Sequence, residues 1–216
     1  MARHPGAQAW VPESAGTARL REAARSCEGC DLYREATQTV FGDGPEDARL
    51  FLVGEQPGDV EDREGEPFVG PAGRLLDQAL EDAGVDRSGV YVTNAVKHFK
   101  FERAEETGRR LHKKPTRGET VACHPWLQAE LRAVRPDLVV ALGATAAQSL
   151  MGTDFRVSTQ RGRVYDLELG EAGRCEFMAT VHPSAVIRLS GDERDEALAR
   201  FTADLRKAAD LVGAAH

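Results

Sequence analysis

The sequence has no long hydrophobic run. No stretch approaches the ~18–20 consecutive apolar residues that a membrane-spanning helix needs. The N-terminal residues, MARHPGAQAWVPESAG, lack the basic start and apolar core of a signal peptide. We therefore expect a cytoplasmic protein with no membrane partner. Of the 216 residues, 41% are hydrophobic and 29% are charged, which excludes a disordered or collagen-like chain and is typical of one domain or two small ones.

Cysteine is scarce, with four residues at positions 27, 30, 123 and 175. In a reducing cytosol these are poor candidates for structural disulfides. Cys27 and Cys30 have the spacing that lets two thiolates face one metal ion or cluster, although a lone pair of this kind also fits a redox pair or coincidence. A redox pair would stand directly after a strand and at a helix start, whereas this pair follows the amphipathic stretch 18–25. A metal or cluster is therefore the better interpretation.

Positive charge is also scarce, because the formal net charge is −7. Residues 97–117 are the exception, with eight basic and three acidic side chains. A phosphate backbone responds to the charge within about a Debye length, roughly 8 Å in physiological salt, so an acidic protein can still bind DNA through one basic segment. Composition alone favours an ordinary solvated loop over such a binding segment.

Short apolar runs alternate with helical patterns along the chain. The runs are nearly continuous, as is typical of buried parallel strands. The alternation predicts an α/β fold, a single-domain three-layer sandwich with a central, mainly parallel four-stranded sheet flanked by helices. We expect strands at 50–53, 90–92, 138–142 and 177–181, an added hairpin from 164–167 and the run at 176, and helices at 75–83, 126–134, 146–150 and about 192–212.

Residues 1–17 are rich in proline, glycine and alanine, so we expect a loosely held N-terminal arm before a domain at 18–216. No linker divides that domain. We expect the protein to act as a monomer.

Polar residues follow each of the four predicted strands. They are Glu55 with Gln56, then Asn94, then the segment 143–145, and finally His182. Ligands of open α/β sheets bind outside the carboxyl ends of the strands. Each residue alone fits an ordinary turn or a buried polar group, but together they predict a site at one edge of the sheet.

Five segments resemble the family 4 uracil-DNA glycosylases in order and spacing. They are GEQPGD (54–59), EPFVGPAG (66–73), VYVTNAV (90–96), LVVALGATAAQSL (138–150) and HPS (182–184). The sequence is most similar to their UdgX branch, which is marked by an inserted basic loop ending in a histidine. Here that loop is RRLHKKP (109–115). The likeness covers most of the chain, from about Cys27 to the C-terminal helix.

This resemblance implies a uracil pocket that acts on uracil-containing DNA, preferably single-stranded, because the target base must leave the stack. Phe68 would stack on the base, and Asn94 would read its edge. His182 would donate to O2, where negative charge develops. Backbone amides near Gln56 would hold O2 or O4, and Asp59 would also line the pocket. The expected DNA-phosphate contacts are Gly58, Arg109, Arg110, Lys113 and Ser184.

The UdgX resemblance further implies that His112 attacks C1′ and leaves the protein covalently joined to the abasic site. Glu55 would keep the imidazole oriented and neutral, since only a free lone pair is nucleophilic. Two alternatives remain open at this point. One is a glycosylase that turns over and releases a free abasic site, and the other is a non-catalytic iron–sulfur protein that binds single-stranded DNA.

The same resemblance implies a 4Fe-4S cluster held by Cys27, Cys30 and Cys123. The fourth cysteine of the relatives is replaced here by His98. Either His98 completes the cluster, as imidazoles do in some iron–sulfur centres, or Cys175 is recruited from the predicted hairpin. We favour His98 and expect the cluster to be structural.

Overall fold

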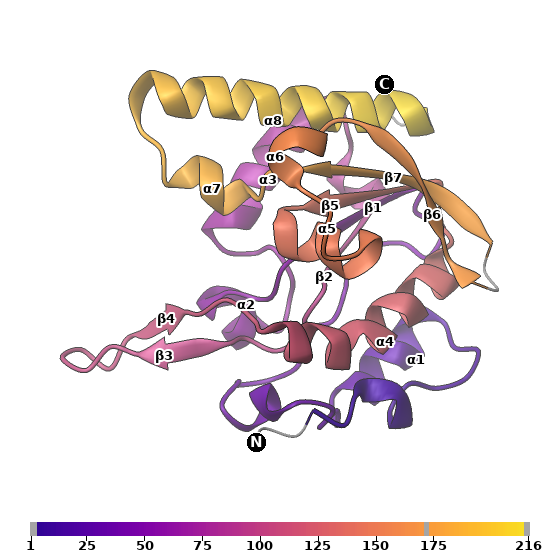
Figure 1. The fold of residues 1–216 in the computed structure, drawn as a ribbon, viewed down its shortest axis with the longest axis vertical. Helices are drawn as coiled ribbons and strands as arrows, with labels where there is room; N and C mark the ends of the chain where they lie inside the picture. Colours follow the sequence, from indigo (N-terminus) through magenta and orange to yellow (C-terminus); the bar gives the residue numbers. More distant parts are fainter. Residues whose placement is uncertain (1–3, 171–172, 214–216) are drawn as a thin grey trace.

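The computed structural model describes residues 4–170 and 173–213 (Figure 1). Within these residues the central sheet has five strands in the order β2-β1-β5-β7-β6. Four of them run parallel, and β6 runs antiparallel to β7. The strands are β1 (Leu50–Gly54), β2 (Val90–Asn94), β5 (Leu138–Leu142), β6 (Val164–Glu168) and β7 (Arg174–Thr180).

The predicted single α/β domain and its mainly parallel sheet are confirmed, but the prediction of four strands is wrong. The added hairpin does not stand apart, because β6 joins the same sheet through β7. Of the β6 side chains, only Leu167 is buried. An edge strand needs little apolar surface, so its sequence signal is weak.

Helices cover both faces of the sheet. Alternate side chains of β1 point to opposite faces, as they must in a strand. Leu52 belongs to a hydrophobic cluster with Leu76 and Phe201, whereas Phe51 belongs to a second cluster with Leu127. The predicted three layers are therefore present. On the first face lie α3 (Pro71–Asp82), α7 (Pro183–Ile187) and α8 (Gly191–Val212), and on the second lie α4 (Arg117–Val134), α5 (Ala144–Met151) and α6 (Val157–Gln160).

Helix α4 begins nine residues before the predicted start at 126. A capping box explains the earlier start. Thr116 Oγ1 accepts a hydrogen bond from the Glu119 N–H at 3.3 Å, and the Glu119 carboxylate accepts from the Thr116 N–H at 2.6 Å. Pro125 lies inside the helix, where it removes one backbone donor.

The N-terminal segment packs against the body of the protein. Ala7 in η1 (Ala7–Ala9) is 1% exposed and shares a third hydrophobic cluster with Trp126 of α4. Helix α1 (Thr17–Ala24) contributes Leu20 to the same cluster. From Ala7 onward the expected arm therefore lies against the domain, while residues 1–3 lie outside the described part of the chain. The division at residue 17 stays a prediction.

The basic segment forms a β-hairpin of its own, with β3 (Phe101–Arg103) paired antiparallel to β4 (Arg110–His112). The sequence predicted only a loop here. The hairpin projects from the body beside α2 (Asp59–Glu64) (Figure 1). Two short helical turns, η2 (Asp31–Arg34) and η3 (Arg87–Gly89), complete the elements. Among the described residues, no helix combines the length and apolarity needed to cross a membrane.

Candidate active site

The carboxyl ends of the four parallel strands carry the predicted polar residues to one edge of the sheet. Glu55 follows β1, and its carboxylate accepts a hydrogen bond from the hydroxyl of Thr145, in the first turn of α5 after β5. His182 follows β7 and lies against Gly143, where an added side-chain carbon would come within 3.0 Å of His182 Cβ. The strand ends are thus in contact across the sheet.

Phe68 and Asn94 approach each other over Gly54 at the end of β1. A side-chain carbon at Gly54 would lie 2.4 Å from Asn94 Oδ1 and 2.6 Å from Phe68 Cζ. The two side chains can meet here only because this residue is glycine. The Phe68 ring lies beside the His182 imidazole, with centroids 6.2 Å apart and planes inclined by 29°. An aromatic ring, an amide and an imidazole therefore share one small region.

Phe68 adopts a strained backbone conformation, with φ of +60°. Such a conformation costs roughly 1–3 kcal/mol for a residue other than glycine and needs support from its surroundings. Gly73 of α3 supplies part of this support, because a side-chain carbon there would lie 1.5 Å from the Phe68 carbonyl oxygen. The Glu61 carboxylate supplies more. It accepts from the Gly58 N–H at 3.1 Å and from the Gly70 N–H at 2.8 Å, and so joins the loops on either side of the ring.

His182 is held as a neutral imidazole. Burial lowers the pKa of His182 to about 4, and the proximity of Arg188 adds to the effect. His182 Nδ1 accepts from the Ser184 N–H at 3.2 Å and lies 2.8 Å from the Ser184 hydroxyl. A ring nitrogen that accepts a backbone N–H carries no proton, so the hydrogen-bond pattern assigns the proton to Nε2. His182 can therefore donate a hydrogen bond through Nε2 at neutral pH.

His112 lies at the end of β4 and contacts Glu55. Its Nε2 atom is 3.4 Å from Glu55 Oε1, and the two side chains are 51% and 21% exposed. Thr145 occupies the other carboxylate oxygen of Glu55. Thr145 thus orients the Glu55 carboxylate, while the half-exposed His112 imidazole remains accessible to a substrate from solvent.

Gln56 joins the sheet edge to the base of the hairpin. Its side-chain oxygen accepts from the Lys100 N–H at 3.1 Å, and its amide donates to the carbonyl oxygens of Lys100 and Lys113, each at 3.1 Å. One amide therefore holds both sides of the hairpin that carries His112. The sequence directed attention to the backbone near Gln56, and nothing in the pattern signalled this use of its side chain.

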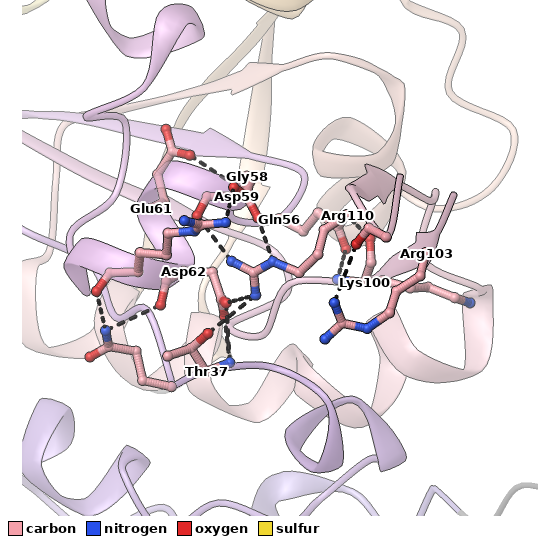
Figure 2. Close-up of polar contacts among 12 residues, drawn as sticks. Thr37, Gln56, Gly58, Asp59, Glu61, Asp62, Lys100, Arg103 and Arg110 are labelled. Carbon is pink, nitrogen blue, oxygen red and sulfur yellow. Dashed lines mark hydrogen bonds and ion pairs between the residues drawn. The ribbon is translucent and has the colours of Figure 1, made fainter. Parts of the chain in front are cut away.

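Arg110 is the second attachment of the hairpin (Figure 2). Its guanidinium pairs with Asp59 through Nε and with Asp62 through Nη1, the latter at 2.6 Å, and it lies over the ring of Phe101 with 5.0 Å to the centroid. The Arg110 side chain is only 10% exposed. Both Arg110 and Asp59 were expected to meet DNA or uracil, but the structure pairs them with each other. The carboxylate of Asp62, which the sequence analysis did not single out, is fully buried.

The other expected phosphate contacts lie around the hairpin and the pocket. Arg109 directly precedes β4 and is exposed. Together with Arg63, Arg103 and Arg110 it lines a cavity of about 430 Å³. Lys113 Nζ lies 2.5 Å from Glu102 across the hairpin, with both side chains 55% exposed. Gly58 and Ser184 lie near the pocket through their contacts with Glu61 and His182.

Three of the four cysteines lie near one another, with Cys123 on α4 and Cys27 and Cys30 in the N-terminal segment. Cys27, Cys30 and Cys123 are 7%, 5% and 4% exposed. Burial raises the pKa of Cys30 to about 11 and that of Cys123 to about 12, and the neighbouring cysteines add to both shifts. The Trp126 indole N–H donates to Cys27 Sγ, and the Lys97 N–H donates to Cys123 Sγ, both at 3.2 Å. Hydrogen bonds of this kind stabilise ligand sulfurs.

His98 is buried one residue after Lys97, whose N–H donates to Cys123 Sγ, and its imidazole has a free lone pair. Burial lowers its pKa to about 4, so the imidazole is neutral. Thr39 donates its hydroxyl proton to the Ala24 carbonyl oxygen at 2.9 Å, so it accepts from His98 Nε2 at 2.9 Å and leaves Nδ1 unprotonated. Cys175 lies elsewhere. It packs in the hydrophobic cluster that contains Leu167, whereas Cys27 and Cys123 belong to a different cluster.

The donor types therefore fit an iron–sulfur cluster with three thiolates and one imidazole. Their arrangement is looser than that of a formed metal site. Across residues 4–170 and 173–213, no three His, Cys, Asp or Glu side chains are grouped so that they could hold a metal ion.

Comparison with known proteins decides the family. The model of the "Uracil DNA glycosylase superfamily" matches residues 41–206, a range that includes every strand of the sheet and the whole hairpin. The chain belongs to this superfamily. The superfamily match covers Glu55, Phe68, Asn94, His112 and His182, and it excludes Cys27 and Cys30.

Several relatives of this superfamily member are glycosylases by name. The type-4 uracil-DNA glycosylase of Archaeoglobus fulgidus is 35% identical over 192 residues, which cover 87% of this chain and 89% of that protein. The type-4 enzyme of Thermotoga maritima is 35% identical over 175 residues, covering 81% and 84%. The type-5 uracil-DNA glycosylase of Pyrobaculum aerophilum is 31% identical over 180 residues, covering 74% of each chain. The resemblance read from the five motifs is confirmed at the level of the superfamily and its type-4 members.

Proposed function

We propose that the protein excises uracil from single-stranded DNA and then becomes covalently attached to the abasic site through His112. The observation that carries this proposal is the contact of His112 with Glu55, 3.4 Å apart, at the strand edge that also holds Phe68, Asn94 and His182. A uracil recognised by those three residues would present its sugar to the exposed imidazole. All of these groups come from one chain, which supports action as a monomer.

The pocket residues suit a pyrimidine that has left the stack. The Phe68 ring offers a face for stacking. The Asn94 amide both donates and accepts, which suits O4 and N3–H of uracil. His182 donates through Nε2 to O2, where negative charge accumulates as the bond between N1 and C1′ breaks. Neutral His182 suits this step, because its Nε2 proton is present without a full charge.

The reaction proceeds in two steps. The N1–C1′ bond breaks first, its electron pair leaves with the uracil anion, and the sugar becomes an oxocarbenium-like cation. The His112 ring nitrogen that does not face Glu55 then gives its lone pair to C1′. This attack makes the imidazole ring positive. The Glu55 carboxylate neutralises that charge by accepting the proton from the ring nitrogen that faces it. The products are uracil and a protein–DNA adduct joined by a bond between imidazole nitrogen and C1′.

The hairpin positions the nucleophile for this attack. Gln56 and Arg110 fix the hairpin at its base and on its inner face. Arg110 and His112 are two residues apart on β4, so their side chains share one face of the strand. We assign Arg110 and its partner Asp59 to this positioning role.

The DNA backbone would follow the remaining basic groups. Exposed Arg109 lines a cavity beside the hairpin with Arg63 and Arg103, and Arg110 and Asp59 form another part of its wall. Lys113 follows His112 and Ser184 contacts His182, so both are close to the pocket, whereas the Gly58 N–H already donates to the Glu61 carboxylate. Backbone phosphates bind well to such groups, and a single strand can bend to reach both sites.

A 4Fe-4S cluster held by Cys27, Cys30, Cys123 and His98 would tie the N-terminal segment to the segment that precedes the hairpin. It would act as a structural cross-link without a redox step. The neutral His98 imidazole and the N–H donors to the two sulfurs support this assignment.

Denaturing gel electrophoresis with a single-stranded, uracil-containing oligonucleotide tests the proposal. A heat-stable band of protein joined to DNA, absent with the thymine-containing control, is the expected result. Free abasic DNA that alkali cleaves, without a shifted band, would instead show a glycosylase that turns over. Unchanged DNA with salt-sensitive binding would show a non-catalytic protein.

A further inference from the structure

Lys97 and Glu130 form an ion pair inside the protein that the chemistry above does not use. Lys97 Nζ lies 2.5 Å from Glu130 Oε2, and the side chains are 1% and 0% exposed. Two charges persist at such depth only when hydrogen bonds complete their surroundings. The partners of the two charges therefore indicate what the pair does.

All three protons of the Lys97 ammonium are used. One goes to Glu130, one to Thr93 Oγ1 at 2.6 Å, and one to the backbone carbonyl oxygen of Asn94 at 2.8 Å. An ammonium has three donors and no acceptor, so this group is saturated. One of the three reaches the residue that would read the uracil edge.

The Glu130 carboxylate is equally well satisfied. Its Oε1 atom accepts from the Gly42 N–H at 3.0 Å, the Tyr91 hydroxyl at 3.1 Å and the Thr93 hydroxyl at 2.9 Å. Tyr91 and Thr93 lie on β2, three residues and one residue before Asn94, which is the last residue of that strand. The pair thus links α4 to the final residues of the strand that delivers Asn94.

We propose that Lys97 and Glu130 are positioning residues for Asn94, a role that rests on the proposed function. The paired strands end at Gly54 and Asn94, and the next backbone hydrogen bonds, from the Ala95 and Val96 N–H groups to the Gly54 and Glu55 carbonyls, do not involve the Asn94 carbonyl. Lys97 Nζ fixes that carbonyl, and the direction of the Asn94 side chain follows from its backbone. The Asn94 amide must fit between Gly54 and Phe68, where contacts leave little freedom.

Stability alone does not account for a charged pair at this place. Matched apolar residues often replace a buried ion pair without loss of stability. An apolar pair, however, offers no donor to the Asn94 carbonyl. The charges therefore provide a fixed position for Asn94 rather than only a filled core.

The test uses the double variant Lys97→Met with Glu130→Gln. It removes both charges, keeps a side-chain oxygen for the donors around Glu130, and approximately preserves volume. We expect a melting temperature close to that of the unchanged protein and a single-turnover rate of uracil release lowered by roughly tenfold to 10²-fold, the cost of slight misplacement of a reacting group. Affinity for the oligonucleotide should stay unchanged, since phosphate contacts lie elsewhere.

A cycle with Asn94→Ala separates positioning from a general structural effect. If the pair acts through Asn94, the double change should slow uracil release no further once Asn94 is alanine. Equal slowing in both backgrounds, or no slowing in a folded double variant, would overturn the inference. If the double variant does not fold, Thr93→Val, which removes only the hydroxyl shared by the two charges, enters the same cycle with the same expected result.

The control is the surface pair Arg49 and Asp137 at the opposite edge of the sheet, 60% and 53% exposed. Arg49→Gln with Asp137→Asn should leave uracil release unchanged. The unmodified protein must release uracil in the same assay. If the unmodified protein releases no uracil, the proposed function fails. If it is active and the double variant releases uracil at the same rate, only the role of Lys97 and Glu130 is contradicted.

Discussion

Two histidines with different surroundings divide the proposed work between them. His182 is kept neutral by burial and donates from Nε2, with Ser184 fixing its other nitrogen. His112 is half exposed beside the Glu55 carboxylate and offers a lone pair. The first suits stabilisation of a leaving group, and the second suits attack on carbon. These assignments lead to separate outcomes when each residue is changed.

His182→Ala should slow uracil release by roughly 10²–10³-fold, the usual cost of removing one donor to a developing anion. Adduct formation should slow equally, because the bond to uracil must break before His112 can attack. Single-turnover measurement of both products gives the two rates. A variant that releases uracil normally but forms no adduct would contradict the assignment of His182 to the leaving group.

Glu55→Gln should lower the rate of adduct formation by about 10²-fold, within the range of general base catalysis. The glutamine keeps the size of the side chain and its contact with Thr145 but loses the charge that balances the imidazolium. Uracil release should fall much less. The ratio of adduct to released uracil measures this, and an unchanged ratio would remove Glu55 from the second step.

At the scale of elements, the β3–β4 hairpin has an inner face that attaches it to the body and an outer face that is open. On the inner face, Arg110 meets two carboxylates of α2, and Gln56 grips the backbone at the hairpin base. Arg109 is exposed, and it lines a surface cavity together with Arg63, Arg103 and Arg110 itself. Two consecutive arginines therefore differ in their surroundings, because Arg110 is paired with carboxylates and Arg109 is exposed.

Arg109→Ala should weaken binding to single-stranded DNA and flatten its salt dependence by about 0.7 in the slope of log affinity against log salt, the value for one phosphate contact. Arg110→Ala should leave that slope almost unchanged but lower the yield of adduct relative to released uracil, because His112 loses its support. Binding titrations at several salt concentrations provide the comparison. Equal flattening by both changes would show that Arg110 contacts phosphate after all.

At the scale of the whole molecule, the cysteine group joins the N-terminal segment to α4 and to the start of the hairpin. Cys27 precedes η2, Cys123 lies on α4, and His98 follows β2. The hydrogen bonds from Trp126 to Cys27 and from Lys97 to Cys123 connect segments that are far apart in the sequence. They help to hold α4 and the segment after β2 in place. The proposed cluster would strengthen that link.

His98→Ala should lose the visible absorbance and the iron content of the purified protein, or make both labile, whereas Cys175→Ala should retain them. Cys175 provides a matched control because it is also a buried cysteine, but it packs in a different hydrophobic cluster. Iron and sulfide analysis of both variants gives the answer. Loss in Cys175→Ala with retention in His98→Ala would reverse the assignment.

The parts of this fold that could be predicted have strong local signals. Buried parallel strands appear as apolar runs, and the rule for strand ends then brought Glu55, Asn94 and His182 together correctly. The hairpin was missed because each of its strands has only three residues, and half of the six are charged. The pairing of Arg110 with Asp59 and Asp62 was missed because those partners lie 51 and 48 residues away along the chain. Local pattern cannot distinguish an arginine that binds phosphate from one that binds a distant carboxylate.

The most direct test of the central claim is mass spectrometry of the protein after reaction with a uracil-containing single strand and digestion of protein and DNA. The account predicts that the sugar remnant lies on His112. It also predicts that His112→Ala forms no adduct yet releases uracil with turnover, because water occupies the space left by the imidazole and captures the cation. A remnant on another residue, such as Lys113, or a full yield of adduct from His112→Ala, would contradict the account.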